Sequence, residues 1–207
     1  MTGIVIATAR EAAPFLARAG IECAREPESP LICDLRPGRP LMLCICGMGS
    51  DRARAGAERL LNSAALTAVV NVGVAGGVGE DVQVGALYRI SEIRRWPSPQ
   101  TRYPCRADRW QDLPPAVVAT VDEPVFDPIR RGEIARVADL VDMEGAAIAS
   151  ECQARGVPFY ALKGVTDLAG QNDRERLLSN LDRLSAALAE AVWRELVEAA
   201  GERRERA

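Results

Sequence analysis

The chain has 207 residues, of which 48% are apolar, and it contains six cysteines, no histidine and a formal net charge of −3. This length and composition predict a single domain over residues 1–201, followed by a charged tail at residues 202–207. The weak negative charge argues against nucleic acid as a partner. The lack of histidine excludes a Ser-His-Asp triad, a Cys-His pair and any histidine-ligated metal.

The N-terminal sequence and the cysteines indicate the compartment. MTGIVIATAREAAPF lacks a basic segment followed by a long apolar one, and no stretch approaches the roughly 20 apolar residues of a membrane span. The cysteine spacings match no zinc site, and Cys44 and Cys46 are expected on one face of a strand as buried free thiols. We therefore expect a cytoplasmic protein without a membrane or metal partner.

In the first half of the chain, short apolar runs rich in β-branched residues alternate with amphipathic stretches. This alternation predicts strands joined by helical crossovers, and therefore an α/β fold. Gly20 is expected to end the first helix and Ser50 to cap the second. The predicted strands are 3–8, 40–47, 66–77 and 84–96, and the predicted helices are 10–20 and 50–64.

The second half of the chain begins with an irregular region. Residues 97–115 are rich in proline, arginine and polar residues and show no sustained period, so they are expected to form a loop or lid. Beyond this region the pattern returns to strands and helices. The predicted elements are a strand at 116–122, a short helix after Pro128, an apolar run at 137–144, a helix at 145–156, a strand at 158–167 and a final helix at 172–201.

Three carboxylates follow directly after apolar runs, namely Glu11, Glu144 and Asp167. Open α/β sheets bind ligands outside the carboxyl ends of their strands, so these side chains are candidates for one site. The alternative for each is a helix N-cap or an acid that favours the first turn of a helix. Convergence of the three carboxylates on one place would support the first interpretation.

The glycine cluster GVAGGVG at residues 73–79 invites comparison with the dinucleotide fingerprint GxGxxG. The pattern fails at its third place when read from Gly73 and at its last place when read from Gly77, and no helix is expected to follow it. A Rossmann cofactor is therefore not expected. The cluster is expected either to let the backbone approach a flat ligand or to form a tight turn.

Several segments, in the right order along the chain, resemble one enzyme superfamily. VVNVGVAGGVGEDVQVGALYRI resembles a strand and G-x-[AS]-G-G turn of purine nucleoside phosphorylases and nucleosidases, and VDMEGAAIASECQARGVPFYALKGVTD resembles their Met-Glu helix start, strand and S/T-D pair. IATAREAAPF and CGMGSDRA are similar to segments of methylthioadenosine/S-adenosylhomocysteine nucleosidases. The resemblance implies a three-layer α/β/α domain with a central mixed, partly closed sheet, and cleavage of an N-glycosidic bond.

The resemblance also implies roles for the three acids. Asp167 would donate a proton to the ring nitrogen of a leaving purine, Glu11 would orient or deprotonate the attacking water, and Glu144 would bind the ribose 2′ and 3′ hydroxyls. These residue types suit the chemistry, because an oxocarbenium-like sugar needs nearby negative charge and the base needs a proton. The further residues implied in substrate binding are Met143, Gly47, Met48, Ala75, Gly76, Gly77, Val125, Phe126 and Lys163.

The substrate implied is a purine nucleoside, with adenine and a modified 5′ group expected. No metal or cofactor is implied, and relatives are commonly homodimers. Hydrolysis is favoured because the phosphate loop G-D-P-x-R of the phosphorylases is absent. Phosphorolysis, with inorganic phosphate as co-substrate, stays open because TVDEPVFDPIRRGEI resembles hopanoid-associated phosphorylases.

Two positions depart from the pattern of the superfamily. Val74 stands where Ser or Thr is usual, and Lys163 stands where the nucleosidases have Arg. Valine cannot hydrogen-bond to water or phosphate, and lysine offers a point charge in place of a planar fork. A non-catalytic relative that only binds a nucleoside therefore stays an alternative, as does an unrelated doubly wound protein in which the three acids only cap helices.

Overall fold

The structure is a computed structural model that describes residues 1–22, 30–35, 41–169 and 174–198. Nine strands and five α-helices lie within these residues, and a short π-helix at Arg194–Glu198 follows the last of them. In chain order the elements are β1 Thr2–Ile6, α1 Ala9–Ala19, β2 Leu31–Asp34, β3 Leu41–Ile45, α2 Ser50–Ser63, β4 Ala68–Gly77, β5 Leu87–Arg95, β6 Arg102–Pro104, β7 Pro115–Thr120, α3 Pro128–Ala135, β8 Leu140–Asp142, α4 Gly145–Ala154, β9 Phe159–Leu168 and α5 Arg174–Trp193.

The strands form one mixed sheet that closes on itself in part. Its order is β2-β3-β1-β4-β8-β7-β5-β6, and β9 pairs with both β4 and β5. β9 runs parallel to β4 and antiparallel to β5, so β4, β9, β5, β7 and β8 make a closed ring. The mixed, partly closed sheet expected from the sequence resemblance is confirmed.

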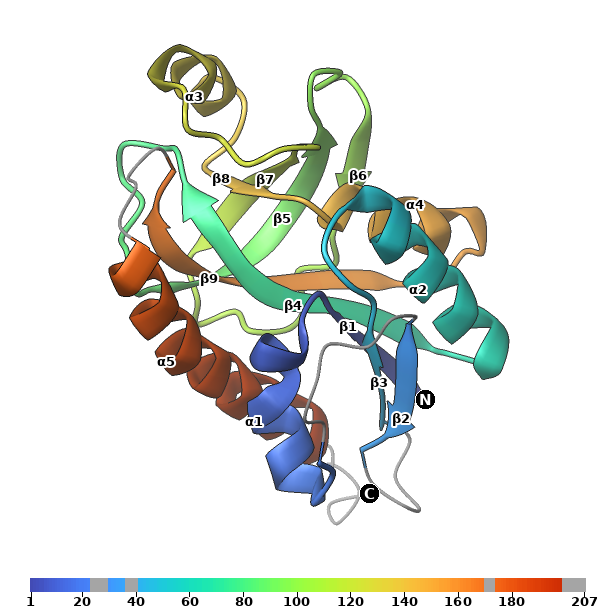
Figure 1. The fold of residues 1–207 in the computed structure, drawn as a ribbon. Coiled ribbons are helices and arrows are strands. Elements are labelled where there is room, and N and C mark those ends of the chain that lie inside the picture. The colour runs from blue at the N-terminus through green and yellow to red at the C-terminus, as the bar shows by residue number, and fades with distance from the viewer. Residues whose placement is uncertain (23–29, 36–40, 170–173, 199–207) are drawn as a thin grey trace.

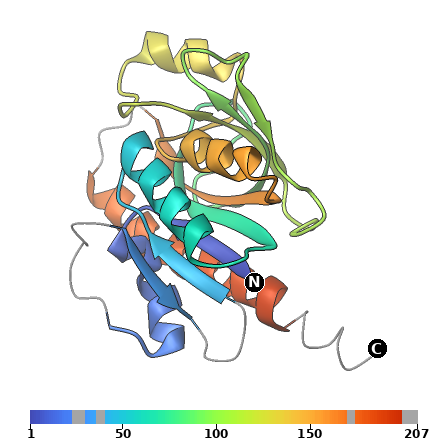
Figure 2. The ribbon, with the colours of Figure 1, turned by 90° about the vertical axis from the view of Figure 1, so that its right-hand side faces the viewer.

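Helices cover the sheet in two layers (Figure 1). α1 and α5 lie side by side on one face, over a core that includes Phe15, Val72 and Leu188. α2 and α4 lie side by side on the other face, as the turned view in Figure 2 shows, over a core that includes Leu60 and Ile148. The predicted three-layer α/β/α architecture is therefore confirmed.

Local signals in the sequence explain where α1 begins and ends. Thr8 is its N-cap, and its hydroxyl and backbone exchange hydrogen bonds with Glu11 in a capping box. Gly20 ends the helix with a φ of 70°, a left-handed conformation that glycine adopts without steric cost. The predicted end of the helix at Gly20 is confirmed, and Glu11 occupies the first turn as the alternative interpretation of this acid expected.

The region at residues 97–115 is more ordered than the sequence predicted. It contains β6, which pairs with β5, and it places the Trp110 ring in the core with 4% of its surface exposed. The Trp110 indole N–H donates to the carbonyl of Ala191 in α5 at 3.1 Å. Most of the segment contains neither helix nor strand, as the sequence predicted for a loop, but β6 and the buried Trp110 ring attach it to the core. β2 was also not predicted, and the tail at residues 202–207 lies outside the described residues.

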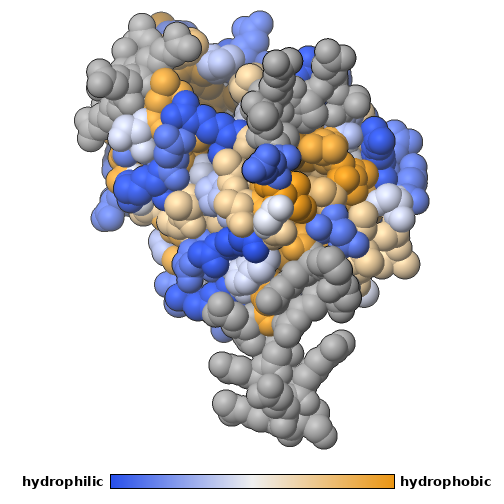
Figure 3. All heavy atoms as spheres, turned by 60° about the horizontal axis from the view of Figure 1, so that its bottom comes forward, coloured by the Kyte–Doolittle hydropathy of each residue, from blue (hydrophilic) through white to orange (hydrophobic). Residues whose placement is uncertain are grey.

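The surface is largely hydrophilic on the face shown in Figure 3, and three of the described cysteines are buried. On the face shown in Figure 3, hydrophilic side chains lie across much of the surface and apolar residues gather in smaller areas between them. Among the described residues, no helix combines the length and the apolar character that crossing a membrane requires. Cys44, Cys46, Cys105 and Cys152 are free thiols, and burial raises the pKa of Cys44, Cys105 and Cys152 to about 12.

Candidate active site

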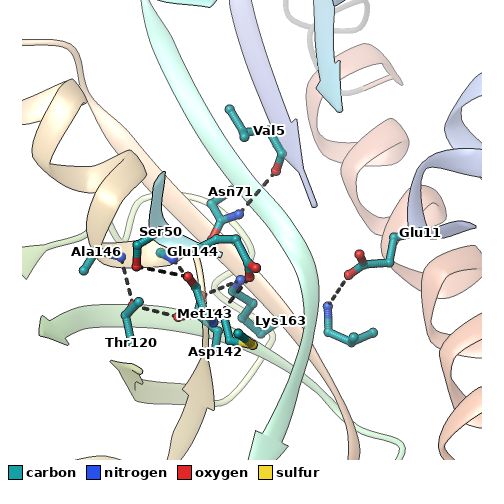
Figure 4. A network of polar contacts seen from close by, with 12 residues as sticks. Val5, Glu11, Ser50, Asn71, Thr120, Asp142, Met143, Glu144, Ala146 and Lys163 are labelled. Atoms are coloured by element: carbon teal, nitrogen blue, oxygen red, sulfur yellow. Dashed lines mark hydrogen bonds and ion pairs between the residues drawn. The ribbon is translucent and has the colours of Figure 1, made fainter. Parts of the chain in front are cut away.

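The candidate site lies where the carboxyl ends of several strands meet. It combines Glu11 from α1, the glycine turn after β3, the end of β4, the end of β8 and the middle of β9 (Figure 4). These segments are far apart in the sequence, and strand pairing together with the packing of α1 brings them close. Sheet edges of this kind are where open α/β proteins bind ligands.

Glu11 is held by three hydrogen bonds from two segments. Its Oε2 accepts from the Thr8 backbone N–H at 3.1 Å and from the Thr8 hydroxyl at 2.7 Å. Its Oε1 accepts from the backbone N–H of Val74 in β4 at 3.0 Å. The side chain is buried, with 6% of its surface exposed. Glu11 therefore both caps its own helix and reaches across to the central strand.

Gly73 keeps a gap open between Glu11 and Lys163. A Cβ atom placed on this glycine would lie 2.9 Å from Oε1 of Glu11 and 3.9 Å from Nζ of Lys163. The carboxylate and the ammonium group are thus no farther apart than the sum of these two lengths. Any side chain at this position would push Glu11 away, so the glycine is required by the close approach of the two groups.

Glu144 occupies the N-cap position of α4 and yet makes no side-chain hydrogen bond to cap it. Its Oε1 instead accepts from the backbone N–H of Gly49 at 2.7 Å, and its Oε2 accepts from the N–H of Met143 at 3.3 Å. Gly49 has a φ of 92°, which turns its N–H toward the carboxylate in a conformation suited to glycine. Glu144 therefore does not cap α4 through its side chain, and the carboxylate points toward the turn after β3.

Two residues that the sequence interpretation missed cap α4 in its place. Oδ2 of Asp142 accepts from the N–H of Gly145 at 3.0 Å, and the hydroxyl of Thr120 accepts from the N–H of Ala146 at 2.8 Å. The Thr120 hydroxyl also donates to Oδ1 of Asp142 at 2.7 Å. Both side chains are buried, with 0% and 5% of their surface exposed for Thr120 and Asp142. They satisfy the first N–H groups of the helix, so the Glu144 side chain is not needed as a cap.

Lys163 is buried and forms an ion pair with Asp142. Its Nζ lies 2.8 Å from Oδ2 of Asp142, and only 1% of its surface is exposed. Burial alone lowers the pKa of Lys163, but the carboxylates of Asp142, Glu144 and Glu11 outweigh it and raise the pKa above its usual value. The lysine therefore stays charged in the interior. Its predicted contact with substrate stays a prediction.

The pKa of Glu144 is raised from its ordinary value of 4.5 to about 7. Burial is the largest cause, and repulsion by the Asp142 carboxylate is the next. Attraction to Lys163 and the hydrogen bond from Gly49 act in the opposite direction and lower it. Near neutral pH the carboxyl group therefore exists in both protonation states.

Asp167 lies farther along β9, at the same end of the sheet. It stands opposite Gly76 of β4, just past a bulge in the pairing of the two strands. The Thr166 hydroxyl donates to Oδ1 of Asp167 at 2.6 Å, and the Asn180 amide in α5 donates to the carbonyl of Thr166 at 2.7 Å. Asp167 is about two residues beyond the level of Val74, which corresponds to roughly 7 Å along a strand.

The remaining predicted residues are distributed around these acids. Ala75, Gly76 and Gly77 form the end of β4, and Gly47 lies in the turn after β3 with a φ of 90°. Val125 is buried under α3 and Met143 packs against the same small core, whereas Met48 and Phe126 each expose 64% of their surface. The structure thus brings Glu11, Glu144 and Lys163 together, and the binding roles of all these residues stay predictions.

Two surface cavities lie away from this site. One, of about 260 Å³, is lined by residues of β6, α4 and the start of β9, among them Tyr103, Gln153 and Phe159. The other, of about 380 Å³, lies on α2 beside Arg59. None of the predicted site residues lines either cavity. Among the residues described, no group of three or more His, Cys, Asp or Glu side chains is placed to hold a metal ion.

The protein has a partly closed mixed sheet between two helical layers, with acids at the ends of its strands. Comparison with known families identifies the class of α/β proteins that has this fold. The profile of the Phosphorylase superfamily matches residues 2–108 and 106–200. The chain therefore belongs to the Phosphorylase superfamily.

The chain is also similar to curated nucleosidases. The chain is 25% identical over 195 residues to a 5′-methylthioadenosine/S-adenosylhomocysteine nucleosidase of Chromohalobacter salexigens, covering 77% of this chain and 81% of the relative. A Shewanella pealeana protein of the same name is 22% identical over 187 residues, with 73% and 81% covered.

Two Helicobacter pylori structures share the fold. The nucleosidase of the same name, in complex with a pyrrolidine nucleoside analogue, superposes with a TM-score of 0.81 at 19% identity, covering 92% of this chain and 95% of that one. Futalosine hydrolase superposes with a TM-score of 0.77 at 18% identity, covering 92% and 94%.

Proposed function

We propose that this protein hydrolyses the N-glycosidic bond of a purine nucleoside. The observation that carries the proposal is the placement of two buried carboxylates, Glu11 beside Gly73 and Glu144 beside Gly49, at the same end of the sheet as Asp167. The names of the relatives support it, since they are nucleosidases and a futalosine hydrolase. These names also support an adenine nucleoside with a modified 5′ group as substrate.

Each acid has a separate task in the proposed reaction. The ionised Glu144 accepts hydrogen bonds from the ribose 2′ and 3′ hydroxyls and favours positive charge on the sugar. Oε1 of Glu11 keeps a lone pair besides the one that accepts from Val74, and with it takes a proton from the attacking water. Asp167 gives a proton to the ring nitrogen as the C–N bond breaks. The products are the free base and the free sugar.

The charges in the site favour water over phosphate as the nucleophile. Glu11, Glu144 and Asp142 are buried carboxylates, and Lys163, the one buried ammonium among the described residues, is already paired with Asp142. An inorganic phosphate anion would enter a region where negative charge already exceeds positive charge. The side chain of Val74 offers it no hydrogen bond. This balance supports hydrolysis over phosphorolysis.

We further propose that the protein acts in the cytoplasm as a homodimer. Free thiols at Cys44, Cys46, Cys105 and Cys152 support a reducing compartment. The 64% exposure of both Met48 and Phe126, which are predicted to line the substrate, supports a second copy that covers this apolar surface.

The first test is a panel of nucleosides incubated with and without phosphate. Methylthioadenosine, S-adenosylhomocysteine, adenosine, inosine and futalosine are each assayed for free base by chromatography. Base release without phosphate is expected from at least one of them. Release that requires phosphate would overturn hydrolysis, and no release from any nucleoside would favour a protein that only binds its ligand.

The role of Asp167 is tested on whichever nucleoside is cleaved. Asp167→Asn should lower kcat by about 10²- to 10⁴-fold, because the leaving base loses its proton donor. Asp112→Asn makes the same chemical change at an aspartate whose side chain is 68% exposed, and it should leave kcat unchanged. Equal turnover by the two variants would remove Asp167 from the mechanism.

A further inference from the structure

We propose that Asp142 and Lys163 are a positioning pair that sets the charge state of Glu144, with Asp142 disfavouring and Lys163 favouring the carboxylate form. Asp142 is bonded to Lys163, Thr120 and Gly145. Both residues act on the charge of the Glu144 carboxyl group. Asp142 was not among the residues that the sequence indicated. The consequence for turnover rests on the proposed function, whereas the effect on Glu144 itself does not.

The pair is fixed in the interior by more than its own contact. Nζ of Lys163 lies 2.8 Å from Oδ2 of Asp142, with 1% and 5% of the two residues exposed. Asp142 also accepts from Gly145 at 3.0 Å and from the Thr120 hydroxyl at 2.7 Å. These two further donors hold the Asp142 carboxylate in place independently of Lys163.

Few charges face Glu144, and each comes from a different element. Asp142 stands at the end of β8, Lys163 in β9, Glu11 in α1, and Cys46 just after β3. Burial raises the pKa of the Cys46 thiol, so this group is neutral. Two carboxylates therefore oppose one ammonium group around Glu144. Figure 4 shows Lys163 between Asp142 and the Glu144 side chain.

The two members of the pair act on Glu144 with opposite sign. A like charge nearby disfavours an ionised carboxyl, and an opposite charge favours it, with larger effects in the interior than in water. The two residues are adjacent to each other, so a loss of packing would have the same direction for both. An electrostatic role predicts opposite shifts, which a purely structural role does not.

The direct test measures the titration of Glu144 by carbon-13 NMR of the side-chain carboxyl groups. Glu144→Gln identifies the resonance by its loss. Asp142→Asn should move the titration midpoint of Glu144 to lower pH, and Lys163→Met should move it to higher pH. A shift of one pH unit corresponds to about a tenfold change in the ratio of ionised to protonated carboxyl. Unchanged midpoints, or shifts of the same sign, would overturn the proposal.

Two controls keep the test decisive. Glu151→Gln removes the ion pairs of α4 with Arg54 and Arg155 at the surface, and it should leave the midpoint unchanged. The double variant Asp142→Asn with Lys163→Met removes both buried charges, so it should fold even where a single variant leaves one charge unpaired. Its midpoint should lie between those of the two single variants, because the two charges act on Glu144 with opposite sign. A midpoint outside that interval would contradict the proposal.

A kinetic measurement separates this proposal from the proposed function. If Glu144 must be ionised to bind ribose, the acid limb of kcat/KM should follow the same shifts as the NMR midpoints in the two single variants. Opposite NMR shifts in a protein that releases no base would support the positioning pair and reject the nucleosidase function. Base release with the same pH profile in all variants would support the nucleosidase function and reject the positioning pair.

Discussion

Burial of the Glu144 carboxyl group makes the stability of the fold depend on pH. Its pKa is about 7 in the folded protein against an ordinary value of 4.5. The folded state therefore binds more protons than the unfolded state between these two values, so the free energy of unfolding falls as pH rises through this range. Below about 4.5 the group is protonated in both states and contributes nothing. Above about 7 the loss is complete and constant, on the order of 3 kcal/mol.

Glu144→Gln should therefore stabilise the protein in a pH-dependent way. Glutamine keeps the shape and an acceptor for the Gly49 N–H but carries no charge. Urea unfolding at pH 5 should show little difference from the wild type, and at pH 8 the variant should be more stable by about 1–3 kcal/mol. An equal difference in the free energy of unfolding at both pH values would contradict this prediction. An increase of the same size from pH 5 to pH 8 in the control Glu151→Gln would also contradict it. The activity of Glu144→Gln should be lower than that of the wild type, because a charge that destabilises the fold is expected to be needed for function.

The start of α4 shows how one element prepares the site. A helix leaves its first N–H groups without partners, and the N-cap residue commonly provides one. Here Asp142 and Thr120, each at the end of a neighbouring strand, provide them instead. The small residues of the first turn, Gly145 and Ala146, let these strands approach closely, since a Cβ on Gly145 would lie 2.7 Å from Oδ2 of Asp142.

The capping hydroxyl of Thr120 can be removed without changing the shape of the side chain. Thr120→Val should lower the free energy of unfolding by about 1–3 kcal/mol, because the Ala146 N–H and an oxygen of Asp142 lose a buried partner. Thr120→Ser keeps the hydroxyl and should recover most of the stability. Denaturant unfolding of the three proteins measures this. If the valine variant is as stable as the serine variant, the hydroxyl does not support α4.

The whole molecule is organised by the closed ring of β4, β9, β5, β7 and β8. β9 completes the ring and carries both Lys163 and Asp167, so closure of the sheet fixes two site residues on one rigid strand. The apolar side chains of Met48 and Phe126 lie outside this framework and are largely exposed. Their exposure is the reason to expect self-association.

Sedimentation equilibrium tests the proposed dimer. The chain has a mass of 22.3 kDa, and a particle of about twice this mass is expected at micromolar concentration. Phe126→Asn should weaken the association, since it replaces an exposed apolar side chain by a polar one. A particle of monomer mass over the whole concentration range would reject the dimer.

Much of the fold could be predicted from the sequence, because its signals are local. The alternation of apolar runs and amphipathic stretches predicted the order of strands and helices, and Gly20 ended α1 where expected. β6 was missed because three residues are too few to show a period, and the order of the segment around it depends on the buried ring of Trp110. The resemblance to the superfamily supplied the closure of the sheet, which no local pattern contains.

For the candidate site, the sequence by itself determined the residue types and their order: acids after apolar runs, glycines at the end of a central strand, and no histidine. An aspartate two residues before Glu144 was a visible signal for a helix cap, but Thr120 lies in an apolar strand and gave none. Only the tertiary structure decided that Asp142 caps α4, that Lys163 pairs with Asp142, and that Glu144 turns toward Gly49. The physical reason is that these contacts join strands remote in sequence, and the energy of a buried charge depends on neighbours that only the folded sheet brings near.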